Sequence, residues 1–406
     1  MADLLTARET CRLLGISRAT LYAYVSRGLL ESRPGPDHRT RLYPRIDVER
    51  LAQRKQAGRS AAAGAAQSLD RGLPVLETRI SLIRPDGPYY RGRSAVAAVR
   101  EGATLEDAAR LLWDCGAHDP FDAIDRYADD DAWPPHVAAL AADAGLPPLE
   151  RAMAAIPLLA TGARGALNST PRARHDIAAA LLRQNAALLV GRPPSAGPVH
   201  ALLAEVWTPG DAGFADLVRA ALVLCADHEL NVSAFGARVV ASTGAHLHAT
   251  VCAGLAALSG PRHGGATARA YALITGARDA ASPQAYIEAR LQRGDDLPGF
   301  GHALYPHGDP RAAELLARLR TRHAGTPALA DLDALLHAAE HTSGQRPNID
   351  LMLAAICHLD TLPATPALVM FAAGRLAGWL AHALEQQAEG KLIRPRARYV
   401  GVGVGD

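Results

Sequence analysis

The chain has 406 residues, of which 49% are hydrophobic and 21% are charged, and it carries 43 lysine and arginine residues against 41 aspartate and glutamate residues. This length corresponds to two or three domains, and the composition excludes a chain that is disordered throughout. The near balance of charge hides an uneven distribution, because residues 1–60 contain 12 basic and 6 acidic side chains. A basic head on a mildly acidic body predicts a separate module with an anionic partner.

Lysine and cysteine usage narrows the chemistry further. The only lysines are Lys55 and Lys391, and neither follows a glycine-rich loop, so a P-loop nucleotide site is excluded. The five cysteines are odd in number and include no C-x-x-C pair, which disfavours a disulfide framework or a thiolate zinc site and fits a reducing compartment. The first ten residues show no apolar signal segment, and no run of about 18 apolar residues is free of polar breaks. We therefore predict a cytoplasmic protein without a membrane span.

Residues 1–55 predict a helix-turn-helix domain with a wing. Thr6 and Glu9 have the spacing of a capping box at the start of a first helix. Ser17 can cap a second helix, and the short interval between the two helices is the tight turn that such motifs need. The segment 32–44 is rich in arginine and suits a basic wing.

This head resembles the winged helix-turn-helix of MerR and excisionase-type proteins, most closely in the run ETCRLLGISRATLYAYVSRGLL. The resemblance implies contacts to DNA from the second helix and the wing. A helical adaptor that keeps this shape without binding DNA is the alternative. The candidate DNA-binding residues are Arg18, Thr20, Tyr22, Arg39 and Arg41.

The rest of the chain reads as a linker and a helical body. The stretch 56–73 is rich in alanine, glycine and serine and has no apolar periodicity, which predicts a linker. Over residues 74–406 most windows carry apolar residues at helical spacing, and prolines fall mainly between these windows. Extended alternating runs are few, and Val75–Leu82 is the best candidate strand. The body is therefore predicted to be large and mainly α-helical.

Several polar residues of the body lie in settings that suit chemistry. His263 and His302 each lie beside glycines, where a ligand can approach the backbone closely. His263 also precedes a helical window, and a histidine at a helix N-terminus stays neutral and donates hydrogen bonds. Asp350 precedes an apolar run, a setting that raises a carboxyl pKa and suits a general base. Planar guanidinium groups that fit carboxylates are offered by Arg311, Arg375 and Arg394.

These groups suit proton abstraction next to a carbonyl, with a polyanionic acceptor. A metal cluster is the alternative at Asp227-His228-Glu229, but no second histidine stands at helical spacing beside it, so we predict no metal site. With 16 histidines in the chain, a single one is more often structural. The ordered set of segments therefore carries more weight than any one residue.

Four segments, taken in order, resemble the citrate synthase family: ADHELNVSA, GPRHGGA, GFGHALY continuing to DPR, and PNID. The resemblance covers about residues 74–401. It implies a citrate synthase fold, that is, a homodimer of mainly helical subunits with a large domain and a small domain, the small one at about residues 266–367. It also implies condensation of acetyl-CoA with oxaloacetate and hydrolysis of the resulting thioester. The CoA thioester is then a substrate, and no cofactor is expected.

The resemblance also implies a role for each matched residue. Asp350 would remove a proton from the acetyl methyl group, His263 would donate a hydrogen bond to the enolate oxygen, and His302 would polarise the ketone of oxaloacetate. Arg394 would reach across the dimer into the partner's site. The oxaloacetate carboxylates would be held by His228, Arg311 and Arg375, and the CoA adenine would be approached by the backbone of Leu297, Pro298, Gly299, Phe300 and Gly301.

The sequence departs from this family in three places. Ala303 stands where many members have arginine, and Leu351 and Met352 stand where they often have aromatic residues. The attached helix-turn-helix is not part of the usual enzyme. Two alternatives to citrate synthase therefore stay open: a 2-methylcitrate synthase that uses propionyl-CoA, and a DNA-binding regulator whose enzyme-like body senses oxaloacetate or CoA. One methylene shifts specificity by only about 1–3 kcal/mol, so the sequence does not separate the two enzymes.

Overall fold

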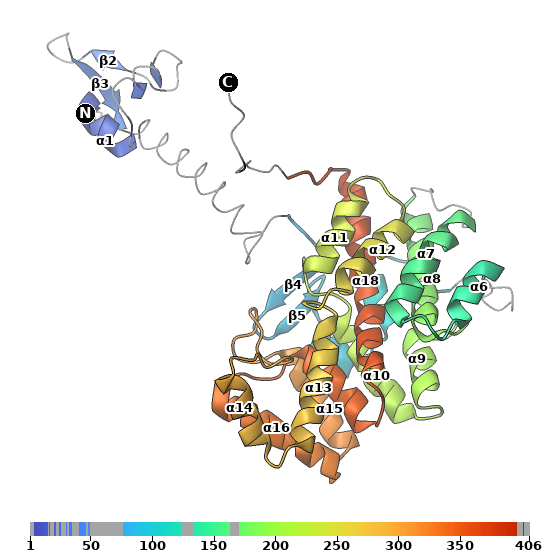
Figure 1. The fold of residues 1–406 in the computed structure, drawn as a ribbon. Coiled ribbons are helices and arrows are strands. Elements are labelled where there is room, and N and C mark those ends of the chain that lie inside the picture. The colour runs from blue at the N-terminus through green and yellow to red at the C-terminus, as the bar shows by residue number, and fades with distance from the viewer. Residues whose placement is uncertain are drawn as a thin grey trace. The chain divides into compact units, whose positions relative to one another are not determined.

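The computed structural model describes residues 4–14, 16, 20–21, 24–25, 30, 32–34, 40–45, 48, 76–122, 133–162, 170–395 and 401. The chain divides into two compact units, Met1–Glu77 and Thr78–Asp406, which we call the head and the body and describe separately (Figure 1). The predicted linker at 56–73 lies outside the described residues.

The described part of the head combines a small sheet with a helix. Its elements are β1 (Leu4–Thr6), α1 (Ala7–Leu14), β2 (Arg33–Pro34) and β3 (Arg41–Pro44), and the strands pair antiparallel in the order β1-β3-β2. The predicted capping box is present, because the backbone N–H and the hydroxyl of Thr6 both donate to Glu9 Oε2 at 2.8 Å. A small apolar core is formed by Leu5, Leu14, Leu21, Leu30, Tyr43 and Val48.

The body begins with a three-stranded antiparallel meander. Its strands are β4 (Ser81–Arg84), β5 (Gly87–Tyr90) and β6 (Arg93–Ser94), in the order β4-β5-β6. The predicted strand Val75–Leu82 is therefore wrong over Leu76–Ile80, because β4 begins at Ser81, and Val75 lies outside the described residues. The reason is a long-range contact: the Thr78 hydroxyl and the Arg79 backbone N–H both donate to Glu385 at 2.8 Å, so this backbone is not free to join a ladder.

Helices make up most of the described body, which confirms the mainly α prediction. One group packs around α18 (Thr365–Glu389), which runs through the middle of it in Figure 1. The members of this group are α4 (Ala95–Arg100), α5 (Leu105–Trp113), α6 (Pro135–Ala142), α7 (Pro148–Gly162), α8 (Pro171–Val190), α9 (Val199–Trp207), α10 (Ala212–Cys225), α11 (Val232–Ala241) and α12 (Leu247–Leu258).

A second group of helices follows α12 in the chain. It consists of α13 (Gly265–Asp279), α14 (Pro283–Gln292), α15 (Pro310–Arg322), α16 (Pro327–Ser343) and α17 (Ile349–Leu359). These helices pack mainly against one another, while α15 also packs on α10 and α17 on α18. Several helices of both groups begin with proline, whose fixed φ and missing N–H suit the first turn.

Helix α18 is long and apolar enough to cross a membrane by length and composition. However, 89% of its apolar window is buried inside the body, as expected for the core helix of a globular domain. Its Trp379 side chain is fully buried, and Arg375 and His382 are buried on the same helix. Polar side chains on a core helix need partners, and Arg375 belongs to the site described next.

Candidate active site

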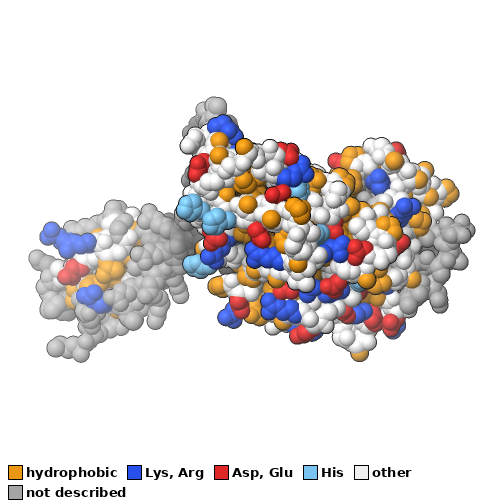
Figure 2. Space-filling view, turned by 90° about the horizontal axis from the view of Figure 1, so that it is seen from below, with side chains coloured by type: hydrophobic (Ala, Val, Ile, Leu, Met, Phe, Trp, Pro, Cys, Tyr) orange, Lys and Arg blue, Asp and Glu red, His pale blue; other side chains and the backbone are white. Residues whose placement is uncertain are grey.

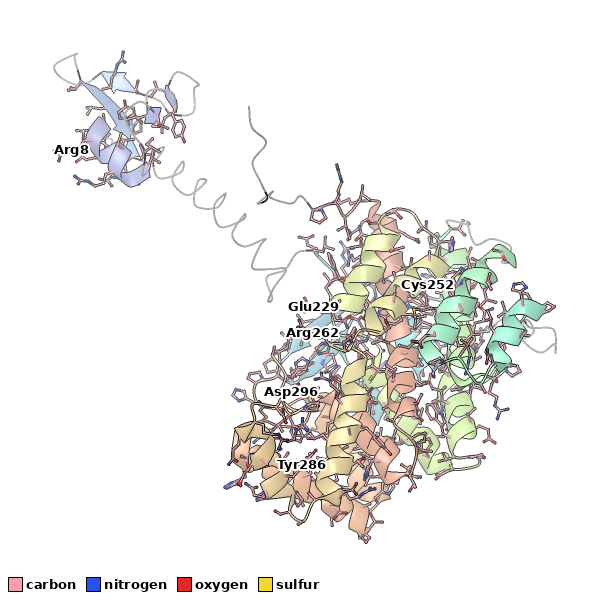
Figure 3. The ribbon with its side chains drawn as sticks, in the orientation of Figure 1. Arg8, Glu229, Cys252, Arg262, Tyr286 and Asp296 are labelled. Atoms are coloured by element: carbon pink, nitrogen blue, oxygen red, sulfur yellow. The ribbon has the colours of Figure 1, made fainter. Side chains whose placement is uncertain are left out.

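Five segments from distant parts of the body converge on one site. His228 lies in the turn between α10 and α11, His263 in the loop before α13, and His302 in the loop before α15. The remaining site residues lie on helices: Arg311 and Asp350 in the first turns of α15 and α17, and Arg375 within α18. The segments of His228 and His263 are neighbours, since Ser233 Oγ lies 2.8 Å from His263 Nε2, and Figure 3 marks them by Glu229 and Arg262.

His228 and His302 lie edge to face, with ring centroids 5.2 Å apart. Burial, together with the nearby charges of Arg311 and Arg375, holds the pKa of the buried His228 well below its ordinary value. Burial and Arg311 also lower the pKa of His302. Both imidazoles are therefore neutral near pH 7, and each has one N–H to donate.

The tautomer of His302 follows from its backbone. The Leu304 N–H donates to His302 Nδ1 at 3.1 Å, so Nδ1 carries a lone pair and the proton is on Nε2. Tyr305 completes this corner, because its ring packs 4.8 Å from that of His302 and its hydroxyl lies 3.0 Å from His228 Nε2. The site therefore presents an Nε2–H of His302 as a hydrogen-bond donor.

His263 lies directly before α13, as the sequence indicated. Its ring meets Phe371 edge to face at 5.6 Å, and Ser233 Oγ contacts its Nε2. Burial, with a further contribution from Arg375, lowers the pKa of His263 to about 4. The Ser233 hydroxyl also donates to Asn231 Oδ1 at 2.9 Å. The imidazole of His263 is neutral near pH 7 and carries one ring N–H.

The two buried arginines differ in how their charge is balanced. Arg311 forms a bidentate pair with Asp309, with Nε–Oδ1 at 3.0 Å and Nη2–Oδ2 at 2.8 Å. Arg375 instead donates from Nε to the carbonyl of Cys225 at 2.7 Å and stacks 4.8 Å above the Phe371 ring. Among the described residues Arg375 forms no ion pair, so its charge is available to an anionic ligand.

Asp350 lies in the first turn of α17, where Asn348 caps the helix. The Asn348 side chain accepts from the backbone N–H of Asp350 at 3.0 Å. Burial raises the pKa of Asp350 to about 6, Arg311 opposes the shift, and Asp309 adds to it. A carboxylate that keeps partial exposure yet holds its proton more tightly than usual matches the general base expected from the sequence.

The predicted CoA segment 297–301 is fastened to the residues just before Asp350. Gly301 N–H donates to Arg346 O at 2.8 Å, and the Asn348 backbone N–H donates to Gly299 O at 2.9 Å. Gly299 has a φ of +86°, and a Cβ there would lie 2.8 Å from Leu351 Cβ, so glycine is required. A cavity of about 90 Å³ beside this loop is lined in part by His302, Tyr305 and Arg346.

Not every predicted residue joins this cluster. Arg394 follows the end of α18, is exposed, and forms no hydrogen bond or ion pair among the described residues. In the head, Thr20 is helical and half-buried, and Arg41 is exposed on β3. The positions Arg18, Tyr22 and Arg39 lie outside the described residues.

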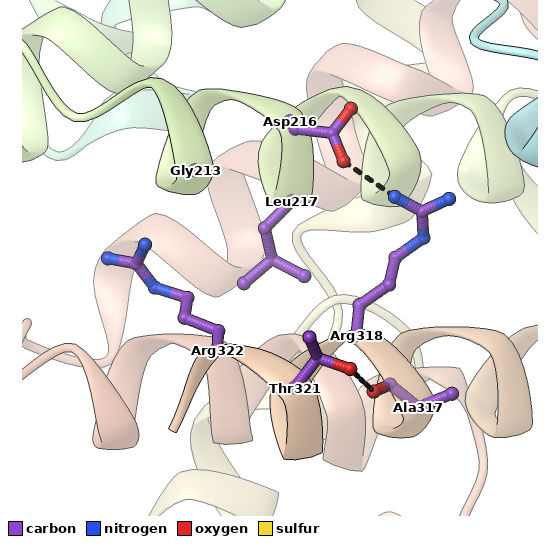
Figure 4. A pocket seen from close by; sticks show the side chains of 7 residues that line it. All are labelled: Gly213, Asp216, Leu217, Ala317, Arg318, Thr321 and Arg322. Carbon is purple, nitrogen blue, oxygen red and sulfur yellow. Dashed lines mark hydrogen bonds and ion pairs between the residues drawn. The ribbon is translucent and has the colours of Figure 1, made fainter. Parts of the chain in front are cut away.

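A larger cavity of about 540 Å³ lies elsewhere, between α10 and α15 (Figure 4). It is lined by Gly213, Asp216, Leu217, Ala317, Arg318, Thr321 and Arg322. Its arginines are already paired, Arg318 with Asp216 at 2.6 Å and Arg322 with Asp211 at 2.6 Å. None of the predicted site residues lines this cavity, and its polar groups are satisfied, so we place the chemistry at the smaller one. No group of three or more potential metal ligands occurs in the described part of the chain.

Sequence reasoning did not single out three residues of the site. Tyr305 and Asp309 lie inside the third of the four family-like segments, but only the fold shows that they contact His228 and Arg311. Ser233 lies in the first segment and reaches His263, 30 residues away. A buried arginine needs a carboxylate, and this rule could have nominated Asp309 from its position two residues before Arg311.

The body brings together three neutral histidines, a carboxyl with a raised pKa and two buried arginines, a set that suits binding a polyanion and moving a proton. Comparison with known families agrees with this class. The family model for the citrate synthase C-terminal domain matches residues 68–396, and a helix-turn-helix domain model matches residues 4–56. The chain therefore belongs to the citrate synthase family and carries a helix-turn-helix domain.

Relatives within this family are of two kinds. Putative citrate synthase 2 of Mycobacterium tuberculosis is 39% identical over 188 residues, which cover 45% of this chain and 50% of that protein. The 2-methylcitrate synthase of Shewanella oneidensis is 33% identical over 219 residues, or 53% of this chain and 54% of that one. The chain thus spans about half the length of the curated relatives it matches.

Solved structures share the fold over most of the body. The citrate synthase of Thermoplasma acidophilum, in ternary complex with carboxymethyl coenzyme A and oxaloacetate, superposes with a TM-score of 0.68 at 23% identity, covering 82% of this chain and 96% of that one. That of Pyrobaculum aerophilum gives a TM-score of 0.67 at 24% identity, covering 82% and 92%. These likenesses confirm the predicted citrate synthase fold.

Proposed function

We propose that the body condenses acetyl-CoA with oxaloacetate and hydrolyses the thioester product, releasing citrate and CoA. The observation that carries this proposal is the raised pKa of Asp350 in a site that also holds neutral histidines and buried arginines. A binding site for a polyanion needs only the arginines. A carboxyl held near pH 6 adds nothing to anion binding, but it suits proton abstraction.

Oxaloacetate would bind first, through its two carboxylates. Arg375, which lacks a carboxylate partner, and Arg311 provide the positive charge, and His228 adds a neutral hydrogen-bond donor. The Nε2–H of His302 would donate to the ketone oxygen and stabilise the alkoxide as the new bond forms. Burial of these groups strengthens each interaction, because it excludes competing water.

The nucleophile would be generated at Asp350. Its carboxylate takes a proton from the carbon next to the thioester carbonyl, and the ring N–H of the neutral His263 donates to the oxygen of the resulting enolate. The enolate carbon attacks the ketone carbon of oxaloacetate and forms the carbon–carbon bond, while the carbon–oxygen π bond opens to an alkoxide. The alkoxide takes up one proton, which balances the proton that Asp350 removed. Water then attacks the thioester carbonyl, the carbon–sulfur bond breaks, and CoA leaves as the thiol.

The acyl group separates two enzyme candidates. One observation favours 2-methylcitrate synthase: such an enzyme is 33% identical to the chain over the matched residues. Citrate synthases are 38% and 39% identical to it. The test measures thiol release with oxaloacetate and either acetyl-CoA or propionyl-CoA in parallel. We expect release from acetyl-CoA at the higher kcat/KM. A higher value for propionyl-CoA would assign the alternative, and oxaloacetate binding without any thiol release would assign a sensor.

We propose a homodimer in which Arg394 completes the partner's site. In a single chain Arg394 is exposed and separate from the other site residues. Several large apolar side chains of the body are also exposed, among them Val232 at the start of α11 with 71% and Leu392 close to Arg394 in the chain with 61%. A second copy of the chain would cover such side chains. A symmetric dimer would place the segment with Arg394, which follows α18, of each chain at the site of the other chain.

A reducing cytoplasm is our proposal for the compartment. All five cysteines are free thiols. Burial raises the pKa of Cys115, Cys225 and Cys357 to about 12, so these thiols stay protonated and unreactive. Such cysteines fit a protein that does not depend on oxidation for its stability.

We propose that the head binds DNA. The match to a helix-turn-helix model, the exposed Arg41 on β3 and the excess of basic residues in positions 1–60 support this function. The visible face of the body in Figure 2 instead mixes Lys and Arg with Asp and Glu, so it offers no single-sign surface to a polyanion.

The head is tested by measuring DNA affinity against salt for the full chain and for a truncation that starts near Arg71. For the full chain, the logarithm of the association constant should fall linearly with the logarithm of salt concentration, with a slope of about −0.9 per neutralised phosphate. The truncation should lose this binding and keep thiol release. Equally weak binding by both proteins at low salt would make the head a structural appendage.

A further inference from the structure

Helix α18 contacts the turn that carries His228 at three successive points. Arg375 Nε donates to Cys225 O at 2.7 Å, and Gly378 N–H donates to Ala226 O at 2.9 Å. One turn further on, His382 Nε2 lies 3.3 Å from Asp227 Oδ1. We call these three contacts between α18 and residues 225–227 the seam. Asp227 directly precedes His228, so the seam fixes the backbone next to a residue of the candidate site.

Asp227 is the centre of the seam and is fully buried. Its other oxygen accepts from the Ser81 hydroxyl and from the Glu229 backbone N–H, the latter at 3.0 Å. These bonds fix the backbone on either side of His228. Burial lowers the pKa of Arg375, and the charge of Asp227 opposes this shift. Among the described residues Arg375 has no carboxylate partner.

His382 is held in one orientation from its far side. It is fully buried, and the Arg238 Nη1 group approaches its Nδ1 at 3.5 Å. Arginine only donates, so Nδ1 must carry the lone pair and the ring proton is on Nε2, the nitrogen that lies 3.3 Å from Asp227 Oδ1. Arg238 is itself fixed by Glu385 at 2.7 Å and by Gln386 at 2.6 Å, both on α18.

The backbone of α18 packs so closely against the turn at Gly378 that no side chain fits between them. A Cβ at this position would lie 2.5 Å from Ala226 O and closer still to Asp227 Oδ1. Both atoms belong to a buried turn, and a backbone oxygen cannot move aside as a flexible side chain can. A side chain at position 378 would therefore push the turn, and His228 with it, away from α18.

We infer that His382 is a positioning residue. It acts through Asp227 to keep His228 and Arg375 in the positions that bind the oxaloacetate carboxylates. The inference rests on the proposed function, since it names what orients the oxaloacetate groups of that same site. Asp227 Oδ1 accepts no hydrogen bond of ordinary geometry among the described residues, so the His382 N–H that lies 3.3 Å away helps to offset its buried charge. Without this N–H, the buried charge of Asp227 is less well compensated, and the turn relaxes. The substrate affected is oxaloacetate, because the CoA loop and Asp350 lie on other elements.

The experiment compares His382→Leu with His382→Gln. Leucine fills the space but donates nothing, whereas the glutamine amide can place an N–H near the position of Nε2. We expect His382→Leu to raise KM for oxaloacetate about 10-fold or more, with KM for acetyl-CoA changed less than about 2-fold. His382→Gln should recover most of the loss. Direct calorimetric binding of oxaloacetate should show the same order of affinities, so the positioning role is measured even if turnover fails.

A matched pair of glycine variants keeps the test independent of how the histidine variants fold. Gly378→Ala should weaken oxaloacetate binding in the same way, with a higher KM for oxaloacetate. Gly236→Ala on helix α11 is the control. Its Cβ would lie at an ordinary contact distance of 3.8 Å from Ala253 O and from Ala257 Cβ, both on α12. An unchanged oxaloacetate KM in His382→Leu or Gly378→Ala overturns the inference. So does an equal loss for both substrates that His382→Gln does not reverse, since that pattern marks a purely structural residue.

Discussion

Asp350→Asn is expected to lower kcat by about 100-fold or more and to leave oxaloacetate binding within a few-fold of the unchanged protein. The amide has nearly the same shape as the carboxyl but cannot accept the proton of the acyl group. In the proposed function, oxaloacetate binds to groups on other elements, namely Arg311, Arg375 and His228. Thiol release measures the first effect, and calorimetry with oxaloacetate alone measures the second. Near-normal turnover would remove Asp350 from the chemistry.

The same residue predicts the acid limb of the pH profile. A general base must be ionised, so kcat/KM should fall as the pH drops through about 6, the pKa to which burial raises Asp350. The pKa of His263 is lowered to about 4, and it therefore does not titrate in this range. Asp350→Asn should lose this limb from its residual rate. An acid limb that persists unchanged near pH 6 would assign the titration to another group.

Asp350→Asn should also stabilise the protein at neutral pH. The folded pKa is raised above the ordinary value of 3.8, so the folded state binds this proton more tightly than the unfolded chain. The associated stability is present below about pH 4 and is lost as the pH rises through about 6. At pH 8 the amide avoids this loss, and the free energy of unfolding should rise by on the order of 1–3 kcal/mol.

A surface carboxylate provides the matched control for these measurements. Asp333 on α16 pairs with Arg320 at 2.7 Å, and both side chains are exposed. Asp333→Asn removes the same charge from a solvated position, and exposed pairs contribute little to stability. It should change neither turnover nor melting temperature. Equal stabilisation by both variants would mean that net charge, and not the buried carboxyl, is responsible.

The sequence predicted the members of the site better than it predicted their partners. His228, His302, Arg311 and Asp350 could be nominated because each lies in a segment with a recognisable order and spacing. Their arrangement depends on contacts such as the Asp309–Arg311 pair and the Leu304 N–H to His302, which are set by loop geometry. Residue type alone therefore indicated the chemistry, whereas the tautomers and charge balance needed the fold.

The position of the first strand of the body likewise depends on a long-range contact that the sequence does not reveal. An alternating apolar run favoured a strand at Val75–Leu82, yet Thr78 and Arg79 bind Glu385, more than 300 residues away in the chain. No local pattern signals such a contact, because it depends on where α18 ends in space. Helices were easier to predict, since their spacing and their N-terminal prolines are local properties.

Mixed dimers of Arg394→Ala and Asp350→Asn are expected to regain activity that neither variant has alone. If Arg394 serves the partner's site, the Arg394→Ala chain contributes its own intact Asp350 and receives Arg394 from the other chain. One of the two sites in each mixed dimer is then free of lesions. After full exchange of equal amounts, about a quarter of all sites should be active.

Subunit exchange is verified with two tagged chains, and thiol release is measured before and after mixing. A chain that carries both substitutions is the control. Mixed with the unchanged protein, it should lower activity, because every site in such a mixed dimer lacks either Asp350 or the partner's Arg394. If Arg394 instead acted within its own chain, the two single variants would show no recovery and the double variant would leave the unchanged subunit fully active. These two mixtures give opposite results for the two arrangements, so together they decide whether the exposed arm after α18 completes a neighbouring site.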